Sequence, residues 1–321
     1  MKTIVMLGVN LLGCLFCLVL ARAAEPWRVE TAGEVWRVKG KIKKDTDISG
    51  AVAVSSKVGL LVSDETRAVQ FFQYDREAAR IVAGESVNLM SMEGAEFDLE
   101  GISLSSDGRS VYVTGSHGLG RKSGAAAPER ERVFRLPISA GTLREKLFQD
   151  TTLLPVLMAN EKLRDAVRIH QDKGGLDMEG LAERDGSLFF GVRSPSVAGQ
   201  AFVVEVRADE LFADPLKSVQ RTHALSLGEG RGIRDLARVS DGFLVVAGPA
   251  GSSEDQGGFT LHHWAGPNQA LVTVGSVPAV GKAEGVMVIE ETAAFVDVVM
   301  FFDGSENGGA TALRLVKSTQ D

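Results

Sequence analysis

Acidic residues stand two positions apart at the start of two similar segments of the sequence. The segment "FDLEGISLSSDGRS" contains Asp98 and Glu100, and the segment "LDMEGLAERDGS" contains Asp177 and Glu179. Because side chains two apart on a strand project to the same side, each pair would bring two carboxylates together. Clustered carboxylates bind hard cations such as calcium, and they also act as general acids and bases.

The same kind of segment recurs along the chain. One aligned position holds, in chain order, Ser49, Glu100, Glu179, Arg234 and Glu284. The position after it holds Gly50, Gly101, Gly180, Asp235 and Gly285. Successive copies are separated by 51, 79, 55 and 50 residues. Internal repeats of about this length indicate the blades of a propeller.

Each copy also has the pattern of a short β-meander. In three copies an Asp-Gly pair, typical of a tight hairpin turn, follows at the same distance: Asp107-Gly108, Asp185-Gly186 and Asp241-Gly242. A run rich in β-forming residues, such as "GFLVVAGP", comes next. The pattern predicts an all-β fold, a β-propeller of five blades, with six blades as an alternative. A β-sandwich with coincidental repeats is the competing interpretation.

Two segments fall outside the regular repeat. Residues 141–172 have helical composition and lengthen the gap between the second and third repeats, which predicts a helical insertion there. The segment "WRVETAGEVWRVKGKIK" precedes the first repeat. We expect it to supply the outer strand of the last blade, because closure of this kind hides the edges of an open sheet.

The N-terminus has the pattern of a secretory signal peptide. Lys2 is followed by an apolar run over residues 4–20 and by the small-residue site Ala21-Arg22-Ala23. We therefore expect a signal peptide at 1–23 and a single propeller domain at 24–321, in the periplasm or secreted. An N-terminal membrane anchor is the alternative. Both cysteines, Cys14 and Cys17, lie in this segment, so the mature chain would have no disulfide.

Charge narrows the class of partner. The whole chain carries a net charge of −7, and removal of residues 1–23 deletes Lys2 and Arg22, which leaves −9. An acidic exported protein is a poor partner for nucleic acid. We expect a small anionic ligand or a protein partner, and no membrane span after cleavage of the signal peptide.

The hairpin geometry predicts where the special residues meet. First strands begin and second strands end at the same edge of a sheet, so every blade would deliver residues to one mouth of the channel. The candidate metal ligands there are Glu100, Glu179, Glu284, Asp98 and Asp177. Such oxygen ligands favour calcium, or magnesium that keeps some of its waters. In the alternative interpretation, Arg234 and Lys282 neutralise the glutamates in a purely structural network.

Three further residues are candidates for catalysis. Arg193 and Arg234 carry planar guanidinium groups that suit a phosphate or carboxylate of a substrate. His117, in the glycine-rich segment "TGSHGLGRKSG", is expected on a flexible loop at the same mouth. Its side chain titrates near neutrality, which suits a general acid or base. A solvent-exposed loop histidine without a catalytic role is the alternative.

The repeats also carry a family resemblance. "DLEGIS" followed by "YVTGSHG", "DMEGLA" followed by "GVRSPSVAGQAFVVEV", and "GIRDLA" with a downstream "AGP" resemble the bacterial family catalogued as domain of unknown function 3616. The resemblance extends from about Ile48 to the C-terminus, and it implies no activity. The chain is more loosely similar to phytase-like and esterase-like propellers, which share the D-x-E-G strand starts. That similarity implies metal-dependent hydrolysis of esters or phosphoesters.

Two hypotheses of function follow. The first is a propeller that binds a divalent cation or a small anionic ligand at an acidic channel mouth, as a metal-dependent hydrolase of esters or phosphoesters. The second is a non-enzymatic scaffold that binds a protein partner. A deep acidic pocket favours the hydrolase, and an exposed apolar face on the insertion favours the scaffold.

Overall fold

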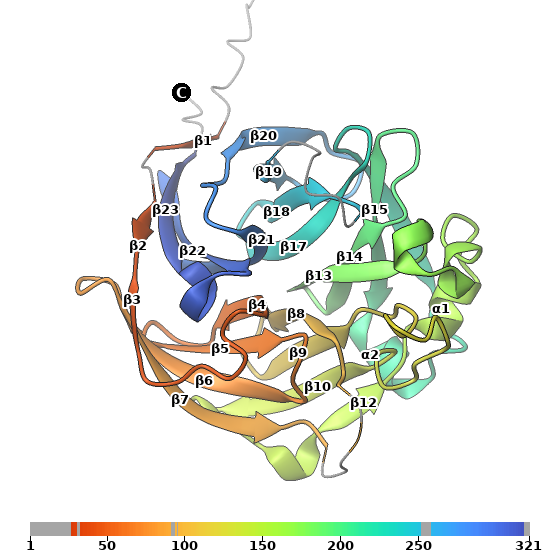
Figure 1. Ribbon diagram of the computed structural model, residues 1–321, viewed down its shortest axis with the longest axis horizontal. Helices are drawn as coiled ribbons and strands as arrows, with labels where there is room; N and C mark the ends of the chain where they lie inside the picture. The colour runs from red at the N-terminus through yellow and green to blue at the C-terminus, as the bar shows by residue number, and fades with distance from the viewer. Residues whose placement is uncertain (1–26, 31–32, 91–93, 95, 252–257, 318–321) are drawn as a thin grey trace, which may run out of the picture.

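The computed structural model describes residues 27–30, 33–90, 94, 96–251 and 258–317. The predicted signal peptide at 1–23 lies outside these residues. Five sheets, antiparallel except where β3 joins the first one, are arranged around a central channel as the blades of a β-propeller (Figure 1). The five-bladed prediction is therefore confirmed. Within the described ranges, no helix is long and apolar enough to span a bilayer.

Each blade is a meander whose first strand is innermost. The first blade contains β4 (Ile48–Ala53), β5 (Val58–Ser63), β6 (Ala68–Asp75) and β7 (Arg80–Asn88). The second contains β8 (Leu99–Leu104), β9 (Ser110–Gly115), β10 (Val133–Ser139), β11 (Thr142–Leu143) and β12 (Gln149–Thr151). The third contains β13 (Asp177–Arg184), β14 (Ser187–Ser194), β15 (Gln200–Arg207) and β16 (Gln220–Ser226). The fourth contains β17 (Arg231–Val239), β18 (Gly242–Pro249), β19 (Thr260–Trp264) and β20 (Leu271–Ser276).

The fifth blade joins the two ends of the chain. It contains β21 (Lys282–Glu291), β22 (Phe295–Asp303) and β23 (Thr311–Val316). The N-terminal strands β1 (Arg28–Val29) and β2 (Glu34–Val35) both pair antiparallel with β23. Strand β3 (Arg37–Lys39) then pairs in parallel with β7 of the first blade. The expected closure by the N-terminal segment is confirmed, and it covers the outer edges of two blades.

The core lies between neighbouring blades. Strands in a propeller are covered on both faces, so they need apolar residues without strict alternation. Strand β14 follows this rule, because seven of its eight residues are buried. Closure is held in the same way: Trp27, just before β1, is 5% exposed and packs with Leu313 of the fifth blade and Val274 of the fourth.

The insertion at 141–172 is present but holds little helix. Besides β11 and β12 it contains α1 (Leu154–Met158), η1 (Glu145–Leu147), η2 (Ala166–Arg168) and the start of η3 (Gln171–Lys173). Helices this short have no stability of their own and depend on packing. The buried side chains of Leu153, Leu157 and Leu163 supply it, since they pack into the core between the second and third blades. The remaining helical elements are α2 (Ala208–Ala213) and η4 (Glu306–Gly309).

Candidate functional site

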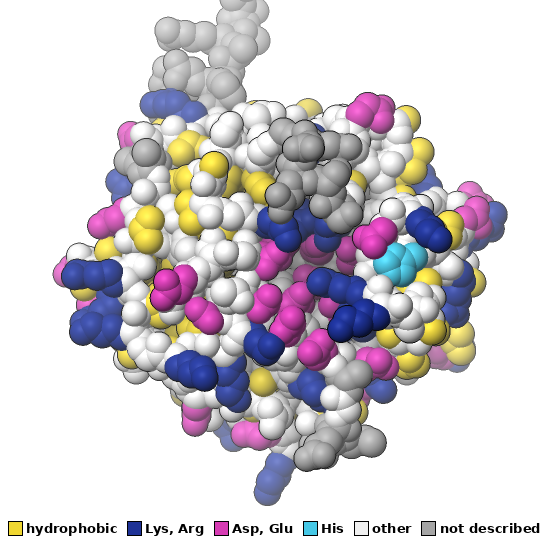
Figure 2. All heavy atoms as spheres, in the orientation of Figure 1, with side chains coloured by type: hydrophobic (Ala, Val, Ile, Leu, Met, Phe, Trp, Pro, Cys, Tyr) yellow, Lys and Arg dark blue, Asp and Glu magenta, His cyan; other side chains and the backbone are white. Residues whose placement is uncertain are grey.

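A cavity of about 880 Å³ opens at one mouth of the channel. Its volume lies within the usual range for small-molecule sites. Figure 2 shows that acidic side chains fill this hollow and that basic side chains flank it. The expected acidic mouth is therefore present, and Glu100, Asp177, Glu179 and Glu284 all line it.

The acidic residues reach the channel because every inner strand has a β-bulge at the same place. The strand pairing skips one residue in each blade, and these five, here called the inner ring, are Ser49, Glu100, Glu179, Arg234 and Glu284. A bulge inserts an unpaired residue and redirects its side chain. The position that the sequence alignment singled out is thus one structural position, repeated around the channel.

The glycine after the bulge allows the inner strands to approach closely. A Cβ atom on Gly101 would lie 2.6 Å from the Cβ atom of Leu181 and 2.9 Å from its backbone nitrogen. The fourth blade has Asp235 at this position instead. Its buried carboxylate accepts hydrogen bonds from the Leu236 and Val286 backbone amides, both at 2.7 Å. These two bonds satisfy a side chain for which the other blades have no space.

A second set of residues faces the inner ring. In each blade, the first-strand residue just before the bulge pairs with a residue of the second strand. The next residue along the second strand belongs to this set. This outer ring consists of Asp64, Ser116, Arg193, Gly248 and Asp303. Both rings meet at the channel mouth, as the hairpin geometry predicts.

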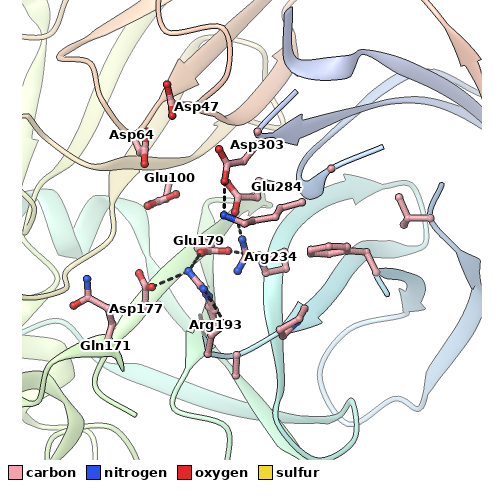
Figure 3. A pocket seen from close by; sticks show the side chains of 18 of the residues that line it. Asp47, Asp64, Glu100, Gln171, Asp177, Glu179, Arg193, Arg234, Glu284 and Asp303 are labelled. Atoms are coloured by element: carbon pink, nitrogen blue, oxygen red, sulfur yellow. Dashed lines mark hydrogen bonds and ion pairs between the residues drawn. The ribbon is translucent and has the colours of Figure 1, made fainter. Parts of the chain in front are cut away.

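Two arginines neutralise the third-to-fifth-blade side of the pocket. The Arg193 Nη1 atom lies 2.8 Å from Glu179 Oε1 and 3.2 Å from Asp177 Oδ2. The Arg234 Nε atom lies 2.8 Å from Glu179 Oε2, and its Nη2 atom contacts Glu284 (Figure 3). Arg234 is only 2% exposed. Both arginines are near the expected place, but each is already ion-paired with two carboxylates of the protein itself.

The first-and-second-blade side of the pocket is different. One carboxylate oxygen from each of Asp64, Asp98 and Glu100 can be chosen so that all three lie within 4.8 Å of one another. We call these residues the acidic trio. Burial and then the charges of Asp98 and Glu179 raise the pKa of Glu100 well above its usual range. Burial also raises the pKa of Asp64 to about 7.

Two basic residues contact the trio, but neither contacts Glu100. Arg130 Nη1 lies 2.8 Å from Asp98 Oδ2, and Arg121 Nη2 lies 3.2 Å from Asp64 Oδ2. Glu100 is 4% exposed, and no hydrogen-bond donor or basic group of the described residues contacts its carboxylate. Crowded oxygen ligands of this kind fit a hard divalent cation. The residues that fit one are therefore the trio, while Asp177, Glu179 and Glu284 of the expected set are held by arginines.

The fourth blade supplies an apolar wall. Gly248 leaves room at its outer-ring position, and the Phe259 ring fills that room: a Cβ atom on Gly248 would lie 2.5 Å from Phe259 Cδ1. Pro249, Ala250 and Val277 continue the wall. The pocket thus has an acidic side at the trio, a side where arginines pair with the carboxylates, and an apolar side at the fourth blade.

The expected position of His117 is wrong. The residue is 1% exposed and is not among the residues that line the pocket. Its Nδ1 atom lies 2.9 Å from the Gly115 carbonyl oxygen, and its Nε2 atom accepts a hydrogen bond from the Leu153 amide at 3.2 Å. Burial lowers its pKa to about 4. The glycine-rich segment folds back on the insertion, so His117 anchors that insertion instead of facing a ligand.

Sequence reasoning assigned no role to three pocket residues, although the hairpin geometry places Asp64 at the channel mouth. Asp64 follows the second strand of the weakest repeat, so it was not assigned as a ligand. Arg121 lies in the loop after β9, and its side chain is 56% exposed. Phe259 lies just before β19, outside every repeated motif. Only Asp64 had a signal that a register argument would find.

Comparison with protein families gives one match. A family model described as "Protein of unknown function (DUF3616)" matches residues 47–137 and 127–308. None of the curated protein sequences compared with the chain matches it significantly.

Solved structures share the propeller arrangement at low identity. An exo-beta-1,3-galactanase from Phanerochaete chrysosporium is similar with a TM-score of 0.50 and 8% identity, over 92% of this chain and 67% of that one. A gluconolactonase from Xanthomonas campestris gives 0.44 and 13%, over 92% and 95% of the chains. U3-55K gives 0.39 and 12%; the match covers 88% of this chain and only 65% of the U3-55K chain. At these identities the likeness concerns the fold alone.

Proposed function

The chain belongs to the DUF3616 family of proteins of unknown function, and we propose that it is a divalent-cation-dependent hydrolase of small esters. The observation that carries the proposal is the Glu100 carboxylate, which is 4% exposed, lines the pocket and has no basic partner among the described residues. A buried carboxylate without a partner is costly, and a bound cation removes that cost.

The acidic trio would hold the cation. Asp64, Asp98 and Glu100 offer hard oxygen ligands from two neighbouring blades, and calcium is the cation we favour. A cation bound there would polarise the carbonyl group of an ester. Arg121 and Arg130 place positive charge beside Asp64 and Asp98, and a bound cation would favour the ionised form of Asp64, whose pKa burial raises to about 7.

Asp177 is the group best placed to move a proton. It lines the pocket, its charge contributes to the raised pKa of Glu100, and Figure 3 shows its carboxylate paired with Arg193. Burial raises its pKa to about 6, against the opposing charge of Arg193. Such a carboxylate is ionised at neutral pH but is more basic than an ordinary aspartate, which suits a general base.

The hydrolysis then balances with the groups at hand. A bond forms between the oxygen of water and the acyl carbon, and the bond from that carbon to the alcohol oxygen breaks. Asp177 would accept one proton from the water and return it to the departing alcohol oxygen. The products are a carboxylic acid and an alcohol, and Asp177 ends ionised as it began.

An anionic group on the substrate would contact Arg121. This side chain is 56% exposed, and its one hydrogen bond in the described structure goes to Asp64. It also forms an ion pair with Asp98 at 3.7 Å. Arg193 and Arg234 are less suited to this role than first expected, since their side chains are only 17% and 2% exposed. Because the N-terminus has the pattern of a signal peptide, we also propose that the hydrolase acts in the periplasm or outside the cell.

A second candidate function rests on the surface of the insertion. Leu147, Met158 and Ile169 are 60%, 44% and 40% exposed there, although apolar residues of this size are usually buried. A scaffold that binds a protein partner through the insertion would use these side chains and would need no cation. The two functions differ in their need for Glu100: the hydrolase requires it to bind the cation, and the scaffold does not.

The test is hydrolysis with and without metal. The purified protein is treated with a chelator and assayed on small carboxylic esters, lactones and phosphoesters, before and after calcium, magnesium or manganese is added. We expect activity that depends on one cation and falls at least a hundredfold in Glu100→Gln. Glu65→Gln is the matched control, because Glu65 lies at the same pocket but pairs with Lys44. Cation-independent hydrolysis, or full activity of Glu100→Gln, would contradict the proposal.

A further inference from the structure

The fourth blade departs from the other blades at both ring positions. Its inner-ring residue is Arg234, whose charge is taken up by Glu179 and Glu284 on either side. Its outer-ring residue is Gly248, where the first, third and fifth blades present Asp64, Arg193 and Asp303 to the pocket. Among the described residues, neither ring position of this blade therefore leaves a charged group for a ligand.

An aromatic ring occupies the place of the missing outer-ring side chain. Phe259 comes from the segment before β19 and lies against Gly248, where any Cβ atom would overlap it. The Arg234 guanidinium carbon lies 5.8 Å from the centre of the same ring. The ring is partly exposed and lines the cavity. It is thus fixed between a backbone and a buried arginine while one part of it faces the pocket.

The wall around Phe259 is apolar over several residues. Pro249 ends β18 and Ala250 follows it, and Val277 and Pro278 follow β20, so two connections of the fourth blade line the cavity together with the ring. The same cavity contains Glu100 and Asp64 on its acidic side. A ligand that fills the cavity would contact carboxylates at one end and hydrocarbon at the other.

We propose that the pocket selects esters whose alcohol part is an aromatic or branched hydrocarbon, and that this part packs against Phe259. The inference rests on the proposed hydrolase for its reaction, but the apolar subsite is a separate claim about binding. The hydrocarbon would lose contact with water on the Phe259 wall, which is the driving force for its selection. The ester carbonyl would then lie toward the acidic trio.

The first experiment compares two acetate esters whose alcohols have similar acidity, benzyl acetate and ethyl acetate. We expect kcat/KM for benzyl acetate to exceed that for ethyl acetate at least tenfold in the cation-loaded protein. Phe259→Ala should remove most of this preference, and Phe259→Leu should keep part of it. Phe295→Ala is the matched control, since Phe295 is also partly exposed but does not line the pocket. An unchanged preference in Phe259→Ala would overturn the inference.

A second experiment does not depend on catalysis. Benzyl alcohol binding to the full protein is followed by saturation-transfer NMR after chelation, with ethanol as the comparison. We expect a signal for benzyl alcohol that Phe259→Ala removes and Phe295→Ala retains. Binding without any hydrolysis would support the apolar subsite and contradict the hydrolase. Hydrolysis with no preference and no benzyl alcohol binding would contradict the subsite alone. Thermal midpoints of all variants check that each one is folded.

Discussion

Arg234 and Glu179 occupy the same inner-ring position in neighbouring blades, and the Arg234 Nε atom lies 2.8 Å from Glu179 Oε2. The pattern-breaking arginine thus neutralises the glutamate of the copy before it and also that of the copy after it, Glu284. The repeat therefore divides into two parts. The glutamates of the third and fifth blades belong to a structural network, and only Glu100 of the second blade is left for a ligand.

The arginine should be essential for stability. Arg234→Met removes one of the two arginines that pair with the buried Glu179 and also removes the arginine that pairs with Glu284. The negative charges of the two glutamates then repel each other without a cation between them. Breaking a buried ion pair from one side costs about 3–5 kcal/mol. Urea unfolding should show a loss of that size. Lys282→Met is the control, because Lys282 is 48% exposed and its pair with Asp303 should contribute less than about 1 kcal/mol. Equal stability of the two variants would show that the network is not structural.

The close approach of the inner strands predicts a second effect on stability. Gly101→Ala would place a Cβ atom 2.6 Å from that of Leu181, on a strand that is packed on both sides. Overpacking of this kind costs about 1–3 kcal/mol. Gly251→Ala meets no atom within 4 Å and should change the free energy of unfolding by less than about 0.5 kcal/mol. If Gly101→Ala were equally harmless, the inner strands would be farther apart than described.

His117 should make the fold sensitive to acid. Its pKa is about 4 in the folded protein and about 6.5 in an unfolded chain, because burial disfavours the charged ring. The unfolded state therefore binds the proton first, and stability that is full above pH 6.5 is lost as the pH falls towards 4. Between pH 7 and pH 5 the loss from this residue is about 2 kcal/mol.

Unfolding of His117→Gln at the two pH values measures that contribution. The variant should lose about 2 kcal/mol less than the wild type between pH 7 and pH 5. His170→Gln is the control for the substitution itself, since His170 is partly exposed and lines the open pocket. An identical pH dependence in His117→Gln would mean that His117 is accessible to solvent, as the sequence had suggested.

Arg121 should distinguish charged from neutral substrates. The Arg121→Ala variant removes the half-exposed guanidinium beside Asp64, so kcat/KM for monoethyl succinate should fall at least tenfold relative to that for ethyl acetate. Urea unfolding of the variant checks that it is folded, because Arg121 also pairs with Asp64 and Asp98, whose side chains are 16% and 5% exposed. Lys122→Ala removes a neighbouring exposed cation and should affect both substrates equally. A parallel loss on both esters in Arg121→Ala would remove Arg121 from substrate binding.

The repeat could be recognised in the sequence because its most informative residues lie at the β-bulge of each inner strand. The bulge places Glu100, Glu179 and Glu284 in the channel, and the close approach of the next inner strand favours glycine after the first two, at Gly101 and Gly180. Both features leave a fixed mark in the sequence at fixed spacing. The number of blades and the channel mouth could therefore be predicted from local patterns.

Local patterns could not predict which pocket residues pair with one another and which are left to contact a ligand. Arg193 contacts Glu179 on the neighbouring strand, and Arg234 contacts Glu179 from the next blade. These contacts depend on side-chain distances that the spacing of residues in the sequence does not encode. His117 follows a strand end and precedes glycines, so its loop looked mobile, but the chain folds it under Leu153. Phe259 enters the pocket because Gly248 leaves room for it, a relation between two different strands.

The central claim is that the acidic trio binds a divalent cation, and thermal unfolding tests it most directly. The purified protein is treated with a chelator, and calcium, magnesium or manganese is then added back. A cation that binds only the folded state at a hundredfold excess over its dissociation constant adds about 2.7 kcal/mol of stability. We predict a clear rise in the midpoint with one cation, absent in Glu100→Gln and retained in Glu65→Gln. No rise with any cation would contradict the account and leave the trio a structural network.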